Sequence, residues 1–353
     1  MNRGTSLYLD VVRFVAAFIV FMDHYSEQRV SGGLFYELGP FGGEAVDVFF
    51  VLSGYVIGYA VDEREPSARI YTINRAARIY SVVVPALVLT YTLDFIGQRL
   101  NRDLYFAMVN IRAGNDIWQY VTSLLFINQV WSVNTTPGSL FAYWSLGYEV
   151  WYYVIFGVAA FARGFWRNLG VAALLLLAGP NIAALFPLWL LGLFAYRLTS
   201  RRLLSHRVCS MLMYGSIAGW LGYHVMSHFT GRLLIPGLGI RQELVQDYVI
   251  GLLFAAHLAG VSIIAPKIAG LSPLVAEAIR WVAGTTFSLY LFHQPIMFIM
   301  VSALPWRVDS PAARLIVWTG TMLSVFALAQ ITERRKHVWR ALFTRMASPA
   351  TQS

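Results

Sequence analysis

Two side chains in the first apolar stretch, residues 7–24, have the types and spacing to do chemistry: Arg13 and His24. Their separation of eleven residues corresponds on a helix to about 16 Å of rise and only about 20° of residual rotation. Both side chains would therefore share one face. An arginine supplies a fixed positive charge, and a histidine exchanges protons near neutral pH. Because ionisable groups inside apolar helices are costly, this pair indicates function.

Two carboxylates, Glu44 and Asp47, begin the next apolar stretch, 44–61. Negative charge is favoured at a helix N-terminus, so we interpret Glu44 as a solvated helix start. Asp47 lies about one turn deeper and is a candidate partner for the histidine or the arginine of the first stretch. Ser53 and Gly54 lie in mid-span, where small residues let helices approach closely, and packing is the favoured interpretation for them.

Arg75 and Arg78 precede the third apolar stretch and share a helical face, because they are three residues apart. Taken alone, the pair is typical of the positive charge near the cytoplasmic end of a membrane helix. The functional interpretation is a phosphate clamp, since paired guanidinium groups bind phosphate oxygens through bidentate, charge-assisted hydrogen bonds.

Two further ionisable residues lie inside apolar, aromatic-rich stretches. Glu149 is about two turns into its helix, and because a glutamate there needs a cationic or hydrogen-bonding partner, a functional role is favoured. His293 is followed by Pro295, which frees backbone carbonyls, so this histidine either hydrogen-bonds across the kink or takes part in catalysis. His257 has only apolar neighbours along the chain and is interpreted as structural.

The composition indicates a polytopic membrane protein: 353 residues with 58% hydrophobic, 15% aromatic and 13% charged side chains. The net charge of +9 fits the bias of lysine and arginine toward cytoplasmic loops better than nucleic-acid binding. Cys209 is the single cysteine, which excludes an intrachain disulfide and a cysteine-based metal cluster. No segment has a ligand spacing for zinc, iron–sulfur or haem, so no metal is expected.

Apolar runs of spanning length predict an all-α, polytopic transmembrane bundle of about ten helices. We expect them near residues 7–24, 44–61, 79–97, 143–162, 168–180, 181–197, 208–227, 248–265, 282–304 and 313–331. Gly179 and Pro180 split the fifth from the sixth, and the short stretch 118–131 is expected to be interfacial or re-entrant. No long hydrophilic segment interrupts the chain, so residues 1–353 are expected to form one membrane domain.

Lysine and arginine fall mostly on the cytoplasmic side when the N-terminus is placed there, which favours both termini in the cytoplasm. The exceptions assigned to the outside include Arg99, Arg102 and Arg112 in the loop 98–117, and Arg232. In this topology the arginine of the first stretch lies toward the cytoplasm and the histidine toward the outer side.

In this order, the motifs resemble acyltransferase family 3, membrane proteins that include glycan O-acetyltransferases of bacterial surface polysaccharides. Arg13 and His24 match the family's arginine, ten residues, histidine pattern. Arg75 and Arg78 match its cytoplasmic arginine-x-x-arginine. The resemblance runs from the first apolar stretch through the last, so it covers essentially the whole chain.

Three more segments contribute to the resemblance. Residues 47–55 look like the family's apolar segment ending in serine-glycine-aromatic, and Trp144-Ser145-Leu146 with Glu149 look like its tryptophan-serine-leucine, then glutamate signature. Residues 290–295 are similar to a further segment, with Gln294 where an aromatic residue is common. These segments add further candidate site residues, which are Ser53, Trp144, Ser145, Tyr290 and His293.

The resemblance implies a multi-pass enzyme of the bacterial cytoplasmic (inner) membrane. It would transfer an acyl group, usually acetyl, from cytoplasmic acyl-CoA to a carbohydrate hydroxyl on the periplasmic side. By matching position, His24 would be the essential histidine, Arg13 its companion, and Arg75 and Arg78 the coenzyme A contacts. Some members carry a fused soluble esterase-like domain; this chain ends soon after the last predicted span, so none is expected here.

The expected donor is therefore acetyl-CoA or another acyl-CoA, without a metal. The expected acceptor is a glycan or glycolipid, such as an exopolysaccharide, an O-antigen or a lipid-linked oligosaccharide. Membrane lipid and surface-polysaccharide assembly proteins are the other expected partners, and nucleic acid is not.

Chemically, His24 suits the base that deprotonates the acceptor hydroxyl, while Arg13 would stabilise negative charge on the donor or hold an acidic partner. Glu149 or Asp47 would orient the imidazole. A covalent acyl-histidine relay is the competing mechanism. The alternative function is a transporter or flippase of a polysaccharide-assembly system, which would also bury polar residues and contain a broken helix.

Overall fold

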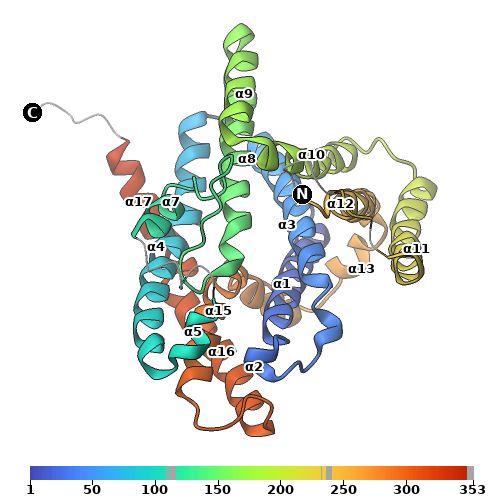
Figure 1. Ribbon diagram of the computed structural model, residues 1–353. Helices are drawn as coiled ribbons and strands as arrows, with labels where there is room; N and C mark the ends of the chain where they lie inside the picture. Colours follow the sequence, from blue (N-terminus) through green and yellow to red (C-terminus); the bar gives the residue numbers. More distant parts are fainter. Residues whose placement is uncertain (109–110, 112–116, 232, 236–240, 348–353) are drawn as a thin grey trace, which may run out of the picture. The chain divides into compact units, whose positions relative to one another are not determined.

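The computed structural model describes residues 1–108, 111, 117–231, 233–235 and 241–347, and it contains no strand within these ranges (Figure 1). The longer helices are α1 (Arg3–Tyr25), α3 (Phe41–Glu63), α4 (Ala68–Leu100), α8 (Trp144–Phe161), α9 (Gly164–Ala178), α10 (Pro180–Ser200), α11 (His206–Thr230), α12 (Leu244–Ala259), α15 (Thr286–Ala303) and α16 (Pro311–Ile331). The shorter ones are α2 (Gln28–Ser31), α5 (Arg102–Phe106), α7 (Ile117–Leu124), α13 (Ala265–Ala269), α14 (Pro273–Ala283) and α17 (Lys336–Met346). Single 3₁₀ turns are η1 (Tyr36–Leu38), η2 (Phe141–Tyr143), η3 (Val261–Ile263) and η4 (Glu333–Arg335).

The all-helical class predicted from the sequence is confirmed. Within the described residues, 7 helical segments are long and apolar enough to cross a membrane: Arg3–Tyr25, Tyr36–Glu63, Ala68–Leu100, Pro180–Ser200, Leu244–Ile263, Thr286–Ala303 and Pro311–Met346. The other three predicted spans form the helices α8, α9 and α11, which are not among these seven. The count of ten and the cytoplasmic placement of both termini stay predictions, and Arg112 and Arg232 lie outside the described residues.

The chain divides into two compact units, each built from separate stretches of sequence. Unit 1 comprises residues 1–16, 43–66 and 163–283, and unit 2 comprises residues 17–42, 67–162 and 284–353. Helix α1 contributes to both, since its residues up to Ala16 belong to unit 1 and those from Ala17 belong to unit 2.

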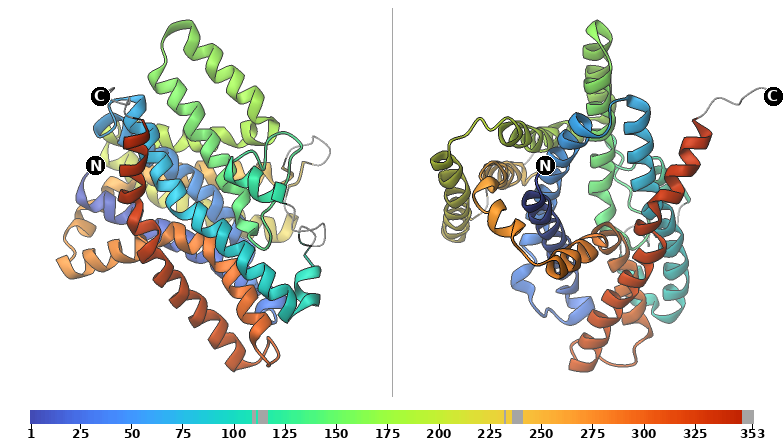
Figure 2. Two further views of the ribbon diagram at one scale, coloured as in Figure 1. Left: turned by 90° about the vertical axis from the view of Figure 1, so that its left-hand side faces the viewer. Right: turned by 180° about the vertical axis from the view of Figure 1, so that it is seen from behind.

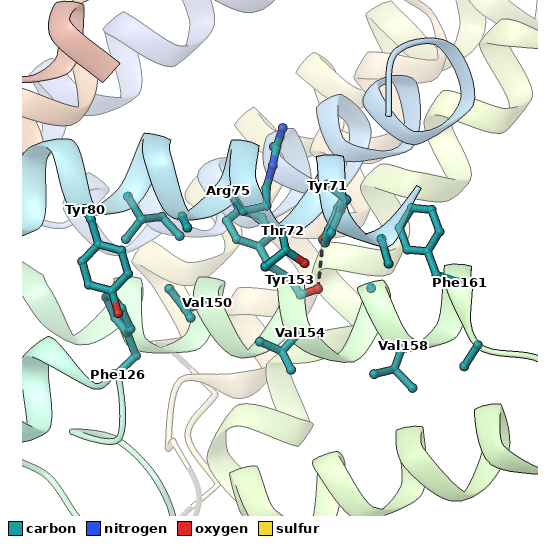
Figure 3. Close-up of a pocket in the computed structure, with 15 residues that line it drawn as sticks. Tyr71, Thr72, Arg75, Tyr80, Phe126, Val150, Tyr153, Val154, Val158 and Phe161 are labelled. Carbon is teal, nitrogen blue, oxygen red and sulfur yellow. Dashed lines mark hydrogen bonds between the residues drawn. The ribbon is translucent and has the colours of Figure 1, made fainter. Parts of the chain in front are cut away.

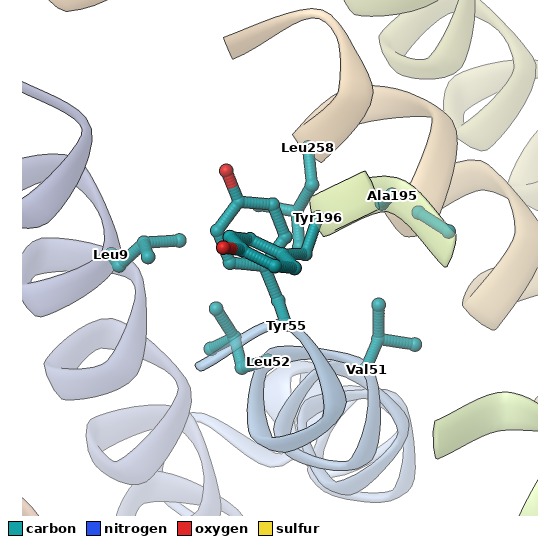
Figure 4. Packing of buried hydrophobic residues seen from close by; sticks show 8 residues of the cluster. Leu9, Val51, Leu52, Tyr55, Ala195, Tyr196 and Leu258 are labelled. Atoms are coloured by element: carbon teal, nitrogen blue, oxygen red, sulfur yellow. The ribbon is translucent and has the colours of Figure 1, made fainter. Parts of the chain in front are cut away.

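The core of unit 1 is formed by apolar residues of α1, α3, α10 and α12 (Figure 4). Leu9, Val51 and Leu258 are almost completely buried there. The rings of Tyr55 and Tyr196 meet edge to face with centroids 5.6 Å apart. This geometry is favourable for aromatic pairs, and it joins α3 to α10.

Two glycines bring the backbones of α3 and α10 into contact. A Cβ atom on Gly54 would lie 1.9 Å from the Trp189 carbonyl oxygen, and one on Gly192 would lie 1.8 Å from the carbonyl oxygen of Val51. Ser53 accepts a hydrogen bond of 3.1 Å from the indole Nε1 of Trp189 at the same crossing. The packing interpretation of Ser53 and Gly54 therefore agrees with the structure, because only small residues permit this approach.

The predicted break between the fifth and sixth apolar stretches is confirmed. Gly179 adopts a φ of +90°, which a side chain would disfavour, and Pro180 begins α10 at a position where its missing N–H is not needed. Helix α9 ends at Ala178 directly before this break.

Unit 2 is organised around α4, which packs against α15, α8 and α17 (Figure 2). Its 33 residues give a length of about 50 Å, more than the roughly 30 Å of a hydrocarbon core. The helix begins at Ala68, with the Ser67 hydroxyl accepting from the Ile70 amide at 3.4 Å. The predicted third span therefore starts earlier than residue 79, and Arg75 and Arg78 lie on the helix itself.

Gly54→Ala should destabilise the protein by about 1 to 3 kcal/mol, because the new methyl group would overlap a backbone oxygen that cannot move aside. The measurement is the thermal unfolding of the purified protein in detergent. Gly215→Ala is the matched control, since nothing lies within 4 Å of a Cβ at that helical position. Equal stability of the two variants would contradict the proposed crossing of α3 and α10.

Candidate active site

His24 lies in the last turn of α1 and is hydrogen-bonded to a carboxylate that follows it closely in the chain. The helix ends at Tyr25, and the Ser26 amide still donates to the Met22 carbonyl at 2.9 Å. This tight turn brings Glu27 back to the imidazole, with 3.2 Å between His24 Nδ1 and Glu27 Oε1. A proton on Nδ1 donates to the carboxylate, which leaves Nε2 as the acceptor nitrogen, the arrangement of a general base.

Arg29 holds Glu27 from the other side. Its Nε donates to Glu27 Oε2 at 2.5 Å, and its guanidinium lies 5.0 Å from the centre of the Phe298 ring and 5.4 Å from that of Phe141. Burial acts to raise the pKa of Glu27, but the hydrogen bond from His24 and the charge of Arg29 outweigh it and lower the pKa. Glu27 is therefore an ionised carboxylate at neutral pH.

His293 lies against His24 within unit 2. The two imidazole rings are stacked, with centroids 5.3 Å apart and planes inclined by 24°. His293 is fully buried, and its Nδ1 lies 2.8 Å from the Leu289 carbonyl, one helical turn earlier. Its Nε2 has no hydrogen-bond partner among the described residues. His293 thus contacts a backbone carbonyl of its own helix and also adjoins the candidate base.

A row of polar side chains follows one face of α8. Ser145, Glu149 and Tyr153 are spaced four residues apart and share that face. The Tyr153 hydroxyl donates to Glu149, and Ser145 Oγ lies 2.6 Å from the hydroxyl of Tyr290 on α15. One residue earlier, the Trp144 ring meets the Tyr148 ring edge to face.

The two arginines of α4 have different surroundings, although they were expected to act as one clamp. The Arg75 guanidinium lies 5.7 Å from the Tyr71 ring centre and 5.8 Å from that of Tyr153. Arg78 interacts electrostatically with Tyr153, Glu149 and Glu333. Arg78 therefore balances partly buried carboxylates, while Arg75 lies among aromatic rings.

Arg75 also lines a cavity of about 620 Å³ between α4 and α8 (Figure 3). Most of the lining is aliphatic or aromatic, including Tyr71, Val154 and Phe161. The Tyr71 hydroxyl donates to the Tyr153 carbonyl at 2.9 Å and so joins the two helices at this cavity. The volume is typical of a small-molecule site. In the predicted topology this cavity lies in the cytoplasmic half of the bundle.

The remaining predicted site residues belong to unit 1. Arg13 forms an ion pair of 3.3 Å with Asp10, one helical turn earlier. Asp47 is almost completely buried, near Asp247 and Arg241, and Ser53 bonds Trp189 as described above. The predicted site residues are thus divided between the units, with His24 and its partners in unit 2.

One expectation from the sequence is wrong, and one histidine has partners that its sequence neighbours did not indicate. Glu44 is not a solvated helix start, since its side chain is buried and accepts from Trp220 Nε1 at 3.0 Å. His257, interpreted as structural, is hydrogen-bonded within the fold, since Tyr8 Oη lies 2.5 Å from its Nε2 and Ser216 Oγ lies 3.1 Å from its Nδ1. In both cases the partners come from helices distant in sequence.

Sequence reasoning also missed two buried or partly buried acids. Glu27 orients His24, the role assigned to Glu149 or Asp47. Its only signal was a carboxylate three residues after the histidine. Asp94 is fully buried on α4 and accepts from the Ser139 amide at 2.8 Å and from the Ser139 hydroxyl at 2.6 Å. Its position inside a predicted span was the signal for it.

Comparison with known proteins shows the family of this chain. Residues 6–334 match the family model described as "Acyltransferase domain" (Acyl_transf_3). An O-acetyl transferase of Shigella phage Sf6 is 30% identical over 162 residues, which cover 42% of this chain and 44% of that protein. The chain thus matches less than half the length of this relative. No solved structure matches the chain significantly.

Glu27→Gln should lower the turnover number at least about tenfold, because a neutral amide no longer stabilises the imidazolium that forms when His24 takes a proton. The acid stability should change as well. Because the pKa of Glu27 is lowered in the fold, the ionised carboxylate stabilises the protein at every pH above the ordinary pKa of 4.5. This stabilisation is lost as the pH falls below 4.5 and through the lowered pKa.

Activity assays and thermal unfolding between pH 3 and pH 8 would measure both effects, with the pH range chosen to bracket the titration of a carboxyl group. Glu37→Gln is the control, since Glu37 is an exposed carboxylate in the same loop. Glu27→Asp should recover part of the activity. A Glu27→Gln enzyme as active as the Glu37→Gln control would contradict the role of Glu27.

Proposed function

Because this chain belongs to the acyltransferase 3 family, we propose that it transfers an acetyl group from cytoplasmic acetyl-CoA to a hydroxyl of a carbohydrate. The observation that carries the proposal is the His24–Glu27 pair, an imidazole oriented by an ionised carboxylate. The similarity to an O-acetyl transferase of a phage supports both the acetyl group and the oxygen acceptor. Family membership favours acyl transfer over the transporter alternative.

The pair supports general-base catalysis. A sugar hydroxyl is a poor nucleophile, so His24 Nε2 takes its proton while the oxygen attacks the thioester carbonyl. The carbon–sulfur bond then breaks, and the coenzyme A thiolate leaves and recovers the proton from the imidazolium. Glu27 stabilises that imidazolium, as the carboxylate of a catalytic triad does.

The competing route passes through an acyl-histidine. In this route His24 Nε2 attacks the thioester first, coenzyme A leaves, and the sugar hydroxyl then takes the acyl group from the imidazole. Incubation with radiolabelled acetyl-CoA in the absence of acceptor distinguishes the two. Label retained on His24 supports the relay, and its absence supports direct transfer.

The cavity beside Arg75 is the proposed donor site. Its aliphatic and aromatic lining suits the acyl group and the hydrocarbon parts of the pantetheine arm, and Arg75 offers a positive charge for a phosphate. Glu149 and Tyr153 lie on the α8 face that leads from this cavity toward Ser145 and Tyr290. Arg78 contributes to donor binding mainly by balancing the charges of Glu149 and Glu333.

The proposed acceptor is a glycan or a glycolipid on the outer side of a bacterial cytoplasmic membrane. The membrane location is supported by the apolar helices of spanning length. The charge bias of the loops supports an outward-facing His24, since it favours a cytoplasmic N-terminus. Proteins of surface-polysaccharide assembly are the expected neighbours.

His24→Ala and His24→Gln should each lower the rate of acetyl transfer by about 10²- to 10⁴-fold, the usual contribution of a general base. The assay is transfer of label from acetyl-CoA to glycan in membranes, at matched protein level. His228→Gln serves as the control, since His228 is exposed at the end of α11. Near-normal acetylation by both His24 variants would contradict the proposed function. Counterflow of the substrate across vesicle membranes, without acyl transfer, would favour a transporter.

Arg75→Gln should raise the KM for acetyl-CoA about tenfold, because a charge-assisted contact to a phosphate is lost. Arg78→Gln should instead lower the amount of assembled protein, since it leaves Glu149 and Glu333 without the cation beside them. Arg69→Gln is the control, as Arg69 is exposed on the same helix and does not line the cavity.

Saturation curves for acetyl-CoA and the yield of folded protein in detergent separate these outcomes. An unchanged KM for acetyl-CoA in the Arg75 variant would contradict donor binding by Arg75. Its charge would then be explained by the positive-inside bias of membrane proteins alone.

A further inference from the structure

Unit 1 contains a second cluster of buried polar side chains, formed by the first turns of α3, the C-terminal half of α11 and the start of α12. Its centre is Glu44, which is buried in the first turn of α3. The carboxylate accepts from Trp220 Nε1 at 3.0 Å, from His224 Nε2 at 3.1 Å and from Gln246 Nε2 at 3.3 Å. Donors from two other helices therefore converge on this one carboxylate.

A second carboxylate pair lies beside it. Asp247 accepts from Arg241 Nε at 2.8 Å, and Arg241 is itself fixed by a bond of 3.1 Å from its amide to Asn181. Burial acts to lower the pKa of Arg241, but the charges of Asp247 and Asp47 raise it above its ordinary value. The guanidinium is therefore always charged and compensates one carboxylate.

Two acceptor oxygens in this cluster lack donors. Asp47 is 3% exposed and Gln246 is 6% exposed, and neither Asp47 Oδ2 nor Gln246 Oε1 has a hydrogen-bond partner among the described residues. Gln246 points into the cluster, because its Nε2 donates to Glu44. Asp47 interacts electrostatically with Glu44, Asp247 and Arg241. Buried polar atoms are normally satisfied, so two orphan acceptors call for an external donor.

The chemistry of the cluster identifies that donor. Three buried carboxylates, Glu44, Asp47 and Asp247, face one permanent cation, so the site has more acceptors than donors. Partly exposed aromatic rings adjoin it, with Trp220 and Tyr223 at centroid distances of 4.6 and 5.5 Å from His224. Convergent acceptors beside aromatic rings suit a ligand that has several hydroxyl groups and apolar faces.

We propose that this cluster binds a hexose unit of the acceptor glycan, with Asp47 Oδ2 and Gln246 Oε1 accepting hydrogen bonds from sugar hydroxyls. The inference rests on the proposed function, in which the acceptor is a carbohydrate. It also accords with the predicted topology, which places this end of α3 and the start of α12 on the outer side. Asp47 is then an acceptor-binding residue, and the chemistry remains with His24.

The first test separates the two substrates kinetically. Asp47→Asn and Gln246→Met should each raise the KM for the acceptor by about 10- to 100-fold, the effect of losing a hydrogen bond in a charged site. The KM for acetyl-CoA should stay at the wild-type value. The acceptor probes are methyl glycosides of glucose, galactose and rhamnose, and a polyprenyl-diphosphate-linked oligosaccharide, each assayed with labelled acetyl-CoA.

These probes also distinguish a free sugar from a lipid-linked one, since both present the same hydroxyls. Gln242→Met is the matched control, because Gln242 is exposed just before α12. An unchanged acceptor KM in both variants overturns the proposal, and so does a rise confined to the KM for acetyl-CoA.

The second test uses the wild-type protein and does not depend on a variant that folds. A hydrophobic carbodiimide labels buried carboxyl groups, and mass spectrometry of the protein in nanodiscs locates the label. The sugar probe should slow labelling of Asp47 and Asp247 at least threefold, with Asp94 in unit 2 as the internal reference, whose carboxylate is bonded by Ser139. Equal labelling of Asp47 and Asp247 with and without the sugar probe overturns the proposed sugar site. Protection of these carboxyl groups by a simple cation alone overturns it as well. Absence of any acetyl transfer by the wild type would instead count against the proposed function.

Discussion

Both units bury ionisable side chains among apolar helices, and the need to give these groups partners decides which helices meet. In a hydrocarbon environment an unpaired polar group is not solvated, so each one must be satisfied from within the protein. In unit 1 the carboxylate of Glu44 gathers donors from α11 and α12. In unit 2, Asp94 fixes the segment before α8 through both donors of Ser139. These contacts place helices whose apolar surfaces alone would permit many arrangements.

The same requirement shapes the surroundings of His24. A base must lose and regain a proton, so its environment has to stabilise the imidazolium without binding it permanently. Glu27 meets this need from three residues away, and Arg29 keeps Glu27 ionised while the rings of Phe141 and Phe298 hold the guanidinium. The site is therefore set by a short turn at the end of α1 together with two distant aromatic residues.

The sequence was sufficient for those features that depend on local pattern. Apolar runs located the helices, and the break at Gly179 and Pro180 follows from their backbone preferences. Ionisable residues inside apolar stretches were expected to need polar partners, and His24, Glu149 and His293 all have polar contacts in unit 2.

Features that depend on tertiary contacts could not be predicted in this way. Glu44 looks like a solvated helix start, yet its donors are 176 to 202 residues away. Arg75 and Arg78 have similar local sequence, and only the packing of α4 gives one of them aromatic neighbours and the other carboxylates. Periodicity assigns two residues to one face of a helix, but it does not say what that face meets.

The difference between the two polar sites is itself informative about their roles. Around His24 the acid is matched by donors on both sides, since Glu27 is bonded by the imidazole and by Arg29. A matched acid keeps one protonation state, which suits a residue that must stabilise the same charge in every cycle. Around Asp47 and Gln246 the acceptors outnumber the donors, and two oxygens are left unsatisfied within the described structure. Such a site gains most from a ligand that brings hydroxyl donors, because binding then satisfies groups that the fold alone leaves unpaired.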